Sequence, residues 1–233
     1  MHVPDGFISA PWSLATGVVA AGAVALALRG ARRELDDRTA PLAGLVATFV
    51  FAGQMVNFPV AAGTSGHLLG GTLAAVLVGP WTATLCLTVV LLVQALLFAD
   101  GGLTALGTNI TLMGVIGVWV GYAVFRLAAR ALPRPRARQR PVVPLAAGIG
   151  GFVSVPAAAA GFALLFAIGG SAPIALSTLM SAMVGVHLAI GLGEAVITAL
   201  VVGSVLAVRP DLVHGARGLV SAPVLVTHGG TAR

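Results

Sequence analysis

The sequence contains no lysine, one cysteine and few charged residues of any kind. Of its 233 residues, 9% are charged and 58% are hydrophobic, and the mean hydropathy is +1.03. Because soluble domains carry charge on about a quarter of their residues, this composition excludes a soluble protein and predicts an all-α integral membrane protein. The 31 glycines favour a single bundle, since small side chains let membrane helices pack closely.

The missing lysine also excludes an ATPase site of the P-loop type, because that loop needs a lysine to reach the phosphates. If ATP drives this protein, another subunit hydrolyses it. The single cysteine, Cys86, lies inside an apolar run, which argues against a disulfide framework or a cysteine metal cluster. The thirteen basic residues are all arginines, placed beside apolar segments without interleaved aromatics, so nucleic acid is not an expected partner.

Seven apolar segments are predicted to cross the membrane. A helix needs about 20 apolar residues to span the ~30 Å hydrocarbon core, so the third segment is short for a crossing. It is kept as one because the arginines then all fall on the cytoplasmic side, with the amino terminus outside. The segments are 11–28, 41–58, 67–78, 81–98, 108–132, 142–168 and 173–208.

The first six residues form a polar segment in front of the first apolar run, and we call them the hook (residues 1–6). No basic residue precedes the apolar run, which is unlike a secretory signal, and the bulky second residue predicts that Met1 is retained. Pro4 and the pair Asp5-Gly6 predict a stiff, bent segment. The alternative is a disordered start that happens to contain a histidine.

A free terminal amine followed by His2 is a ready chelate for a divalent ion. The amine of Met1, the backbone nitrogen of His2 and its imidazole can close two adjacent rings, and such nitrogens suit nickel, copper, cobalt or zinc. We expect His67 to fill the fourth place. Ser65 is predicted to cap a helix whose first turn contains His67, where the helix dipole keeps the imidazole neutral. The alternative is that His67 is an ordinary interfacial residue.

Other polar residues also lie at or near the outer ends of the predicted spans. Such convergence predicts a pocket that opens to the outside. Asp5, Asn57 and Asn109 are candidates to orient the metal ligands. The converging residues are Gln54, Asn57, Thr64, Ser65, Gln94, Asp100 and Asn109.

Two ionisable residues, His187 and Glu194, lie seven positions apart in the last predicted span. This spacing puts them on one helix face, but the rise of ~10 Å keeps them from pairing directly. Ionisable groups inside a membrane are costly and are functional by default. A role in coupling and a structural hydrogen-bond network are both open. No role is predicted for His214 or His228.

Four separated stretches carry motifs that together resemble one family. They read MHVPDGF at 1–7, QMVNFPV followed by GTSGHLLGG within 54–71, FADGGL leading to LGTN over 98–109, and HLAIG at 187–191 leading to Glu194. In this order they resemble the CbiM/NikM family, the substrate-specific components of energy-coupling factor transporters for cobalt and nickel. The likeness extends over residues 1–208.

The resemblance implies a seven-helix, substrate-binding domain over 1–208, followed by a cytoplasmic tail over 209–233. It implies that the amino terminus folds into an outward-facing pocket, where nitrogens of Met1, His2 and His67 hold Ni(II) or Co(II). The ion is then a transported substrate, and no catalytic cofactor or enzymatic activity is expected. The implied partners in a prokaryotic cell membrane are a coupling transmembrane subunit, two ABC-type ATPase subunits and a small CbiN/NikN-like membrane protein.

Two other functions stay open. Ser65 in the stretch GTSG, together with His187, resembles the dyad of rhomboid-type intramembrane proteases, although a serine nucleophile needs its base within hydrogen-bond reach. The topology sets His187 near the middle of the membrane and Ser65 on its outer side. The other alternative is a secondary transporter of metal ions. Such proteins generally place several acidic or histidine residues inside their spans, and only His187 and Glu194 qualify here.

Overall fold

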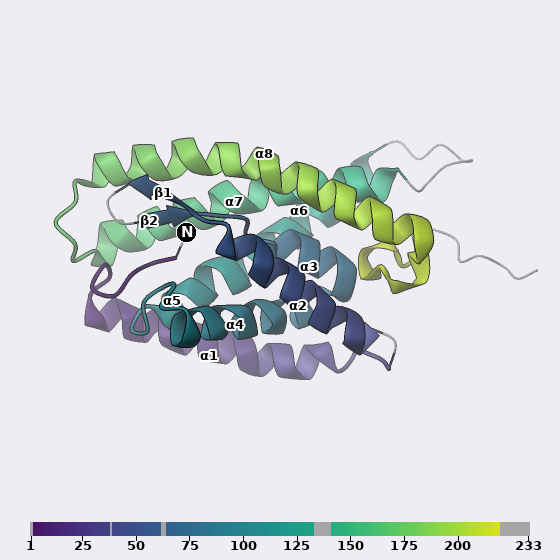
Figure 1. Cartoon of the computed structure of the whole chain (residues 1–233), viewed down its shortest axis with the longest axis horizontal. Helices are drawn as coiled ribbons and strands as arrows, with labels where there is room; N and C mark the ends of the chain where they lie inside the picture. Colours follow the sequence, from purple (N-terminus) through teal and green to yellow (C-terminus); the bar gives the residue numbers. More distant parts are fainter. Residues whose placement is uncertain (1, 38, 62–63, 133–140, 220–233) are drawn as a thin grey trace, which may run out of the picture.

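The computed structural model is a bundle of helices that lie mostly side by side along its long axis (Figure 1). It describes residues 2–37, 39–61, 64–132 and 141–219. The elements are α1 (Ala10–Ala31), α2 (Thr39–Met55), β1 (Phe58–Ala61), β2 (Thr64–Gly66), α3 (Gly71–Val78), α4 (Pro80–Leu97), α5 (Leu106–Asn109), η1 (Ile110–Gly117), α6 (Val118–Ala131), α7 (Val142–Gly169), α8 (Leu176–Val208), η2 (Pro210–Leu212) and η3 (His214–Ala216).

The predicted all-α membrane bundle of seven helical segments is confirmed. Elements α5, η1 and α6 follow one another without a break, so they count as one helix with π-helical turns in the middle. Five helices of the described chain are long and apolar enough to cross a membrane, and α2 is a shorter apolar helix of 17 residues. The placement of the amino terminus outside the cell remains a prediction.

The connection between α2 and α3 differs from the prediction. Residues 58–66 form a small antiparallel hairpin, in which Phe58 lies opposite Gly66 and an irregularity interrupts the register. Helix α3 begins only at Gly71, after Gly70 with a positive φ of 73°. The predicted cap at Ser65 and the placement of His67 in the first helical turn are therefore wrong, because main-chain pairing with β1 takes Ser65 into β2.

The core consists of two buried hydrophobic clusters, one towards each end of the bundle. All eight residues of α3 are buried, and α3 packs against α4 and α6. Helices α7 and α8 pack along each other over much of their length. One end of the bundle gathers the hook, the hairpin and α5, whereas the arginine-bearing ends of α1, α6 and α8 lie at the other (Figure 1).

The start of the tail after α8 packs onto the bundle. Val213 and Ala216 are buried in the cluster at the arginine-bearing end. A side chain added at Gly215 would meet Phe125 and Val76 at 2.8 and 3.0 Å, so this segment lies tightly against α3 and α6. The domain boundary after residue 208 stays a prediction, and His228 lies outside the described residues.

A buried carboxylate holds the start of α4. Glu34, in the connection after α1, accepts hydrogen bonds from the main-chain nitrogens of Trp81 at 3.2 Å and Thr82 at 2.7 Å. These are amide groups that a helix start leaves without a partner inside the helix. Gly79 lets the carboxylate approach, because a Cβ at this position would lie 2.4 Å from Cδ of Glu34.

We expect Gly79→Ala to lower the melting temperature of the detergent-solubilised protein. The alanine would have to adopt a φ of 97° and would displace Glu34, and a strained backbone of this kind costs about 1–3 kcal/mol. Gly22→Ala in α1 is the matched control, since its added Cβ meets nothing within 4 Å. Equal melting temperatures for the two variants would contradict this account.

Candidate metal site

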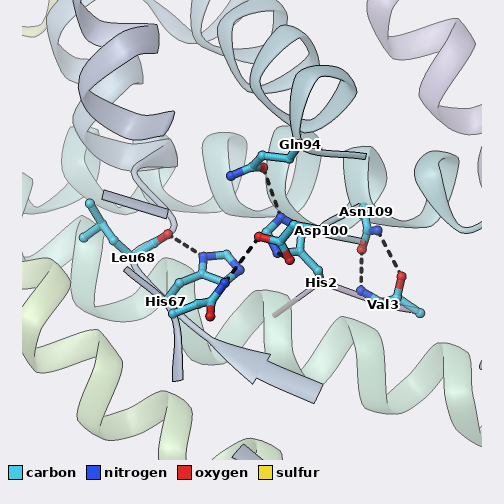
Figure 2. A network of polar contacts seen from close by, with 8 residues as sticks. His2, Val3, His67, Leu68, Gln94, Asp100 and Asn109 are labelled. Carbon is cyan, nitrogen blue, oxygen red and sulfur yellow. Dashed lines mark hydrogen bonds and ion pairs between the residues drawn. The ribbon is translucent and has the colours of Figure 1, made fainter. Parts of the chain in front are cut away.

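The hook lies against the bundle through main-chain hydrogen bonds at Val3. The Val3 amide donates to Oδ1 of Asn109 at 2.8 Å, and Nδ2 of Asn109 donates back to the Val3 carbonyl at 3.2 Å. The same carbonyl accepts from the Gly102 amide at 2.9 Å. Figure 2 shows that this pairing holds the chain directly beside His2.

Asp5 makes the second attachment of the hook. Its carboxylate accepts from the main-chain nitrogens of Leu103 at 3.2 Å and Thr104 at 2.7 Å, and from the Thr104 hydroxyl. These hydrogen bonds, with the hydroxyl foremost, lower the pKa of Asp5 below its usual value. The loop that contains Gly102 can approach Asp5 this closely because Gly102 has no side chain. A Cβ at this position would lie 2.3 Å from the main-chain nitrogen of Asp5.

His2 is buried between two acceptors. Its Nε2 lies 3.1 Å from Oε1 of Gln94, and its Nδ1 lies 3.0 Å from Oδ1 of Asp100. Nδ2 of Asn57 donates to the other carboxylate oxygen of Asp100 at 3.4 Å. The hydrogen bond with His2 is the main cause that lowers the pKa of Asp100, so this carboxylate stays charged beside the imidazole.

His67 lies between β2 and α3 and is buried. Its Nδ1 is 2.7 Å from the Leu68 carbonyl; a carbonyl can only accept, so Nδ1 carries the proton and Nε2 has a free lone pair. Within the described chain Nε2 has no hydrogen-bond partner. Burial lowers the pKa of His67 well below its usual value. The imidazole is thus neutral because it is desolvated, and not because of the predicted helix dipole.

The two imidazoles lie against each other in the structure. The ring centroids of His2 and His67 are 4.4 Å apart, with 26° between the planes (Figure 2). The described residues contain no group of three histidine, cysteine, aspartate or glutamate side chains placed to hold a metal. An ion bound at the edges of these rings therefore needs further donors, such as main-chain or amine nitrogens. Met1 itself lies outside the described residues.

His187 and Glu194 both lie on the buried face of α8, as their spacing predicts. Nδ1 of His187 is 2.8 Å from the Met183 carbonyl, one turn earlier in the same helix. Glu194 instead accepts from the main-chain nitrogens of Leu69 and Gly70 in the connection that follows His67. Their predicted roles as orienting or coupling groups stay predictions.

The sequence predicted which polar residues converge at one end of the bundle. It did not predict the hydrogen-bond partners of two of them, both glutamines. Gln94 contacts His2, and Gln54 donates from Nε2 to the Leu69 carbonyl at 2.8 Å. Both are fully buried. An amide side chain within an apolar helix indicates that the position needs a polar partner. The sequence alone does not show which residue that partner is.

Fold and site together define a multi-pass membrane protein in which the buried imidazoles of His2 and His67 stack on each other at one end of the bundle. The family model described as "cobalt uptake substrate-specific transmembrane region", CbiM, matches residues 2–212. The chain belongs to this family, and it is a prokaryotic membrane component of cobalt or nickel transport.

Relatives and solved structures agree with this assignment. A relative from Haloquadratum walsbyi, named as a metal transport protein, is 38% identical over 91% of this chain and 93% of its own length. The cobalt transport protein CbiM of Sorangium cellulosum is 37% identical, with coverage of 91% and 94%. The fused nickel transport protein NikMN of Rhodobacter capsulatus is 36% identical, and the match covers 91% of this chain but 63% of that protein.

The fold is also that of a crystallised transporter. The crystal structure of a truncated transition metal transporter aligns with a TM-score of 0.81 and 33% identity. The alignment covers 89% of this chain and 99% of that one. The likeness thus includes nearly all of the solved protein and supports the helical arrangement described above.

We expect Asn109→Ala to loosen the hook. The change removes both hydrogen bonds to Val3, and at about 1 kcal/mol for each bond the main-chain amide should exchange with solvent about 30-fold faster. NMR of ¹⁵N-valine-labelled protein measures exchange at Val3. Thr111→Val is the control, because it removes the hydrogen bond from that hydroxyl to the Thr16 carbonyl and leaves the hook untouched. Unchanged exchange at Val3 in Asn109→Ala would refute this attachment.

Proposed function

We propose that this protein is the substrate-capture subunit of an ATP-driven uptake transporter for nickel or cobalt. It binds the divalent ion through the amine of Met1, the main-chain nitrogen and Nδ1 of His2, and Nε2 of His67. One observation carries the proposal: the buried Nε2 of His67 has no hydrogen-bond partner in the described chain and lies beside the His2 ring. A buried polar atom of this kind calls for a ligand.

The proposed ligand set accounts for the contacts of His2. A chelate that uses the His2 main-chain nitrogen closes its second ring through Nδ1, the atom that now faces Asp100. The ion takes the place of this contact and leaves the carboxylate beside it. The charge of a divalent ion is then balanced by the deprotonated His2 amide and by Asp100, which reduces the cost of burying it.

Four nitrogen donors also restrict the choice of metal. Nitrogen ligands disfavour magnesium and calcium, which prefer oxygen, and two fused chelate rings with one further imidazole favour a planar arrangement. Planar nitrogen sites suit Ni(II), whereas Co(II) gains less from that geometry. We therefore place nickel first and cobalt second as the captured substrate.

The proposed partners follow from what this chain lacks and from its relatives. The chain contains no lysine and hence no P-loop, so two ABC-type ATPase subunits and a coupling transmembrane subunit would supply the energy. The name of the matching family model contains the words "substrate-specific", which supports a capture role. A relative named as a fused NikMN protein supports a separate, NikN-like accessory membrane protein for this chain.

A reversible block of the amino terminus tests the chelate. We expect no nickel binding when a short, histidine-free extension with a protease site precedes Met1, because His2 and His67 remain but the terminal amine is gone. Cleavage that leaves Met1 first, verified by mass spectrometry, should restore binding and the visible band of planar nickel. Calorimetry and absorption measure both states of the same protein.

The cleaved protein with His67→Ala serves as the comparison. It retains the amine chelate but loses the fourth nitrogen, so its affinity should drop and its planar absorption should change. An uncut extension that binds nickel as tightly as the cleaved protein would disprove the amino-terminal site. The ion would then have to be sought around Asp100 and His67.

We also expect affinity to fall as the pH is lowered. Binding must remove protons from the terminal amine, whose usual pKa is about 7.7–8.0, and from the His2 amide. Burial lowers the pKa of His67, so His67 adds no proton near neutrality. Two released protons make the dissociation constant rise about a hundredfold from pH 7 to pH 6. Calorimetry at the two pH values measures this slope, and a pH-independent constant would contradict it.

A further inference from the structure

The connection that contains His67 is held from two helices that lie far apart in the sequence. The Leu69 amide donates to Oε2 of Glu194 at 2.9 Å, and the Gly70 amide donates to Oε1 at 2.8 Å. On the other side, the amide of Gln54 in α2 donates to the Leu69 carbonyl. The main chain two and three residues after His67 is thereby fixed between α8 and α2.

Both oxygens of Glu194 accept hydrogen bonds from this connection. The side chain is buried, and no cation pairs with it in the described parts of the chain. Each of its two oxygens accepts from a different main-chain nitrogen. Burial of an ionisable group in a membrane protein is costly. A glutamine offers only one oxygen acceptor, so accepting from both nitrogens requires an acidic side chain.

Open space borders the connection on one side. A hollow of about 550 Å³ lies beside the connection, and His67 and Glu194 both line it, together with Phe49 and Gly53 of α2 and Ile190 of α8. Helix α8 packs mainly against α7 and touches the hairpin and α3 much less. The connection itself is buried, with Leu69 fully inside the bundle, and the hydrogen bonds from Glu194 and Gln54 fix its main chain within this packing.

We infer that Glu194 is a positioning residue for the transported ion. By holding the main chain at Leu69 and Gly70, it keeps the His67 ring stacked on that of His2. Its effect on metal binding passes through the backbone and involves no bond to the ion. The inference rests on the proposed function, because it requires His67 to be a ligand.

Glu194→Gln tests this role in the full-length protein. It preserves the size of the side chain but replaces one acceptor oxygen by an NH₂ group that faces a main-chain N–H. We expect nickel to bind about 10- to 100-fold more weakly, which is the usual effect of losing a group that orients a metal ligand. The visible band of bound nickel should also shift or broaden, and a purely structural role would leave that band unchanged.

Thr198→Val is the matched control. Thr198 lies one turn further along the same buried face of α8, and its hydroxyl has no hydrogen-bond partner within the described residues. It should bind nickel with the affinity and spectrum of the wild type. Gln54→Leu releases the connection from α2 only and should weaken binding less than Glu194→Gln does. If Glu194→Gln does not fold, Glu194→Asp is the test, because its shorter side chain draws the carboxylate back from the Leu69 and Gly70 nitrogens.

The possible outcomes separate the two proposals. Wild-type affinity and spectrum in a folded Glu194→Gln protein would overturn the positioning role, as would an equal loss in Thr198→Val. If Glu194→Gln does not fold, wild-type affinity and spectrum in Glu194→Asp overturn it. If His67→Ala binds nickel as tightly as the wild type, the proposed ligand set and the positioning role both fail. Loss in His67→Ala and Glu194→Gln, with Thr198→Val unaffected, supports both.

Discussion

The attachment of Val3 to Asn109 is the contact on which the site depends. A polar segment can enter an apolar bundle only if its main-chain groups find partners there, because an unpaired amide is expensive away from water. Asn109 meets this demand with one side chain that both accepts from Val3 and donates to it. His2 is the preceding residue, so fixing Val3 also restrains His2, which belongs to the proposed chelate.

Several polar side chains in this half of the bundle form hydrogen bonds with main-chain groups. Asn109 pairs with Val3, Gln54 with Leu69, and Glu194 with Leu69 and Gly70. Helices supply rigid supports, and the segments that carry His2 and His67 lie between them. Gln94 and Asp100 contact His2 instead, and the buried Nε2 of His67 has no partner among the described residues. This division suits a site whose ligands must be placed accurately.

Sequence periodicity and composition could predict the helices and the end of the bundle at which polar residues meet, because both depend on local pattern. The hairpin at 58–66 was missed, since its glycines, serine and threonine also read as a turn into a helix, and pairing with β1 decides between the two. The contact of Glu194 with Leu69 joins residues 125 positions apart. A seven-residue spacing shows the face on which Glu194 lies, but it does not reveal what that face meets.

The balance of charge explains how the proposed site could hold a divalent ion with so few acidic side chains. In the proposed ligand set, deprotonation of the His2 amide supplies one negative charge and Asp100 supplies the other, so no carboxylate has to bind the metal. Oxygen-preferring ions thus gain little here. Three of the four proposed donors belong to Met1 and His2, which precede the segment held by the hydrogen bonds of Val3 and Asp5. Movement of one short segment would therefore dismantle most of the proposed coordination at once, which would let tight capture and later release coexist.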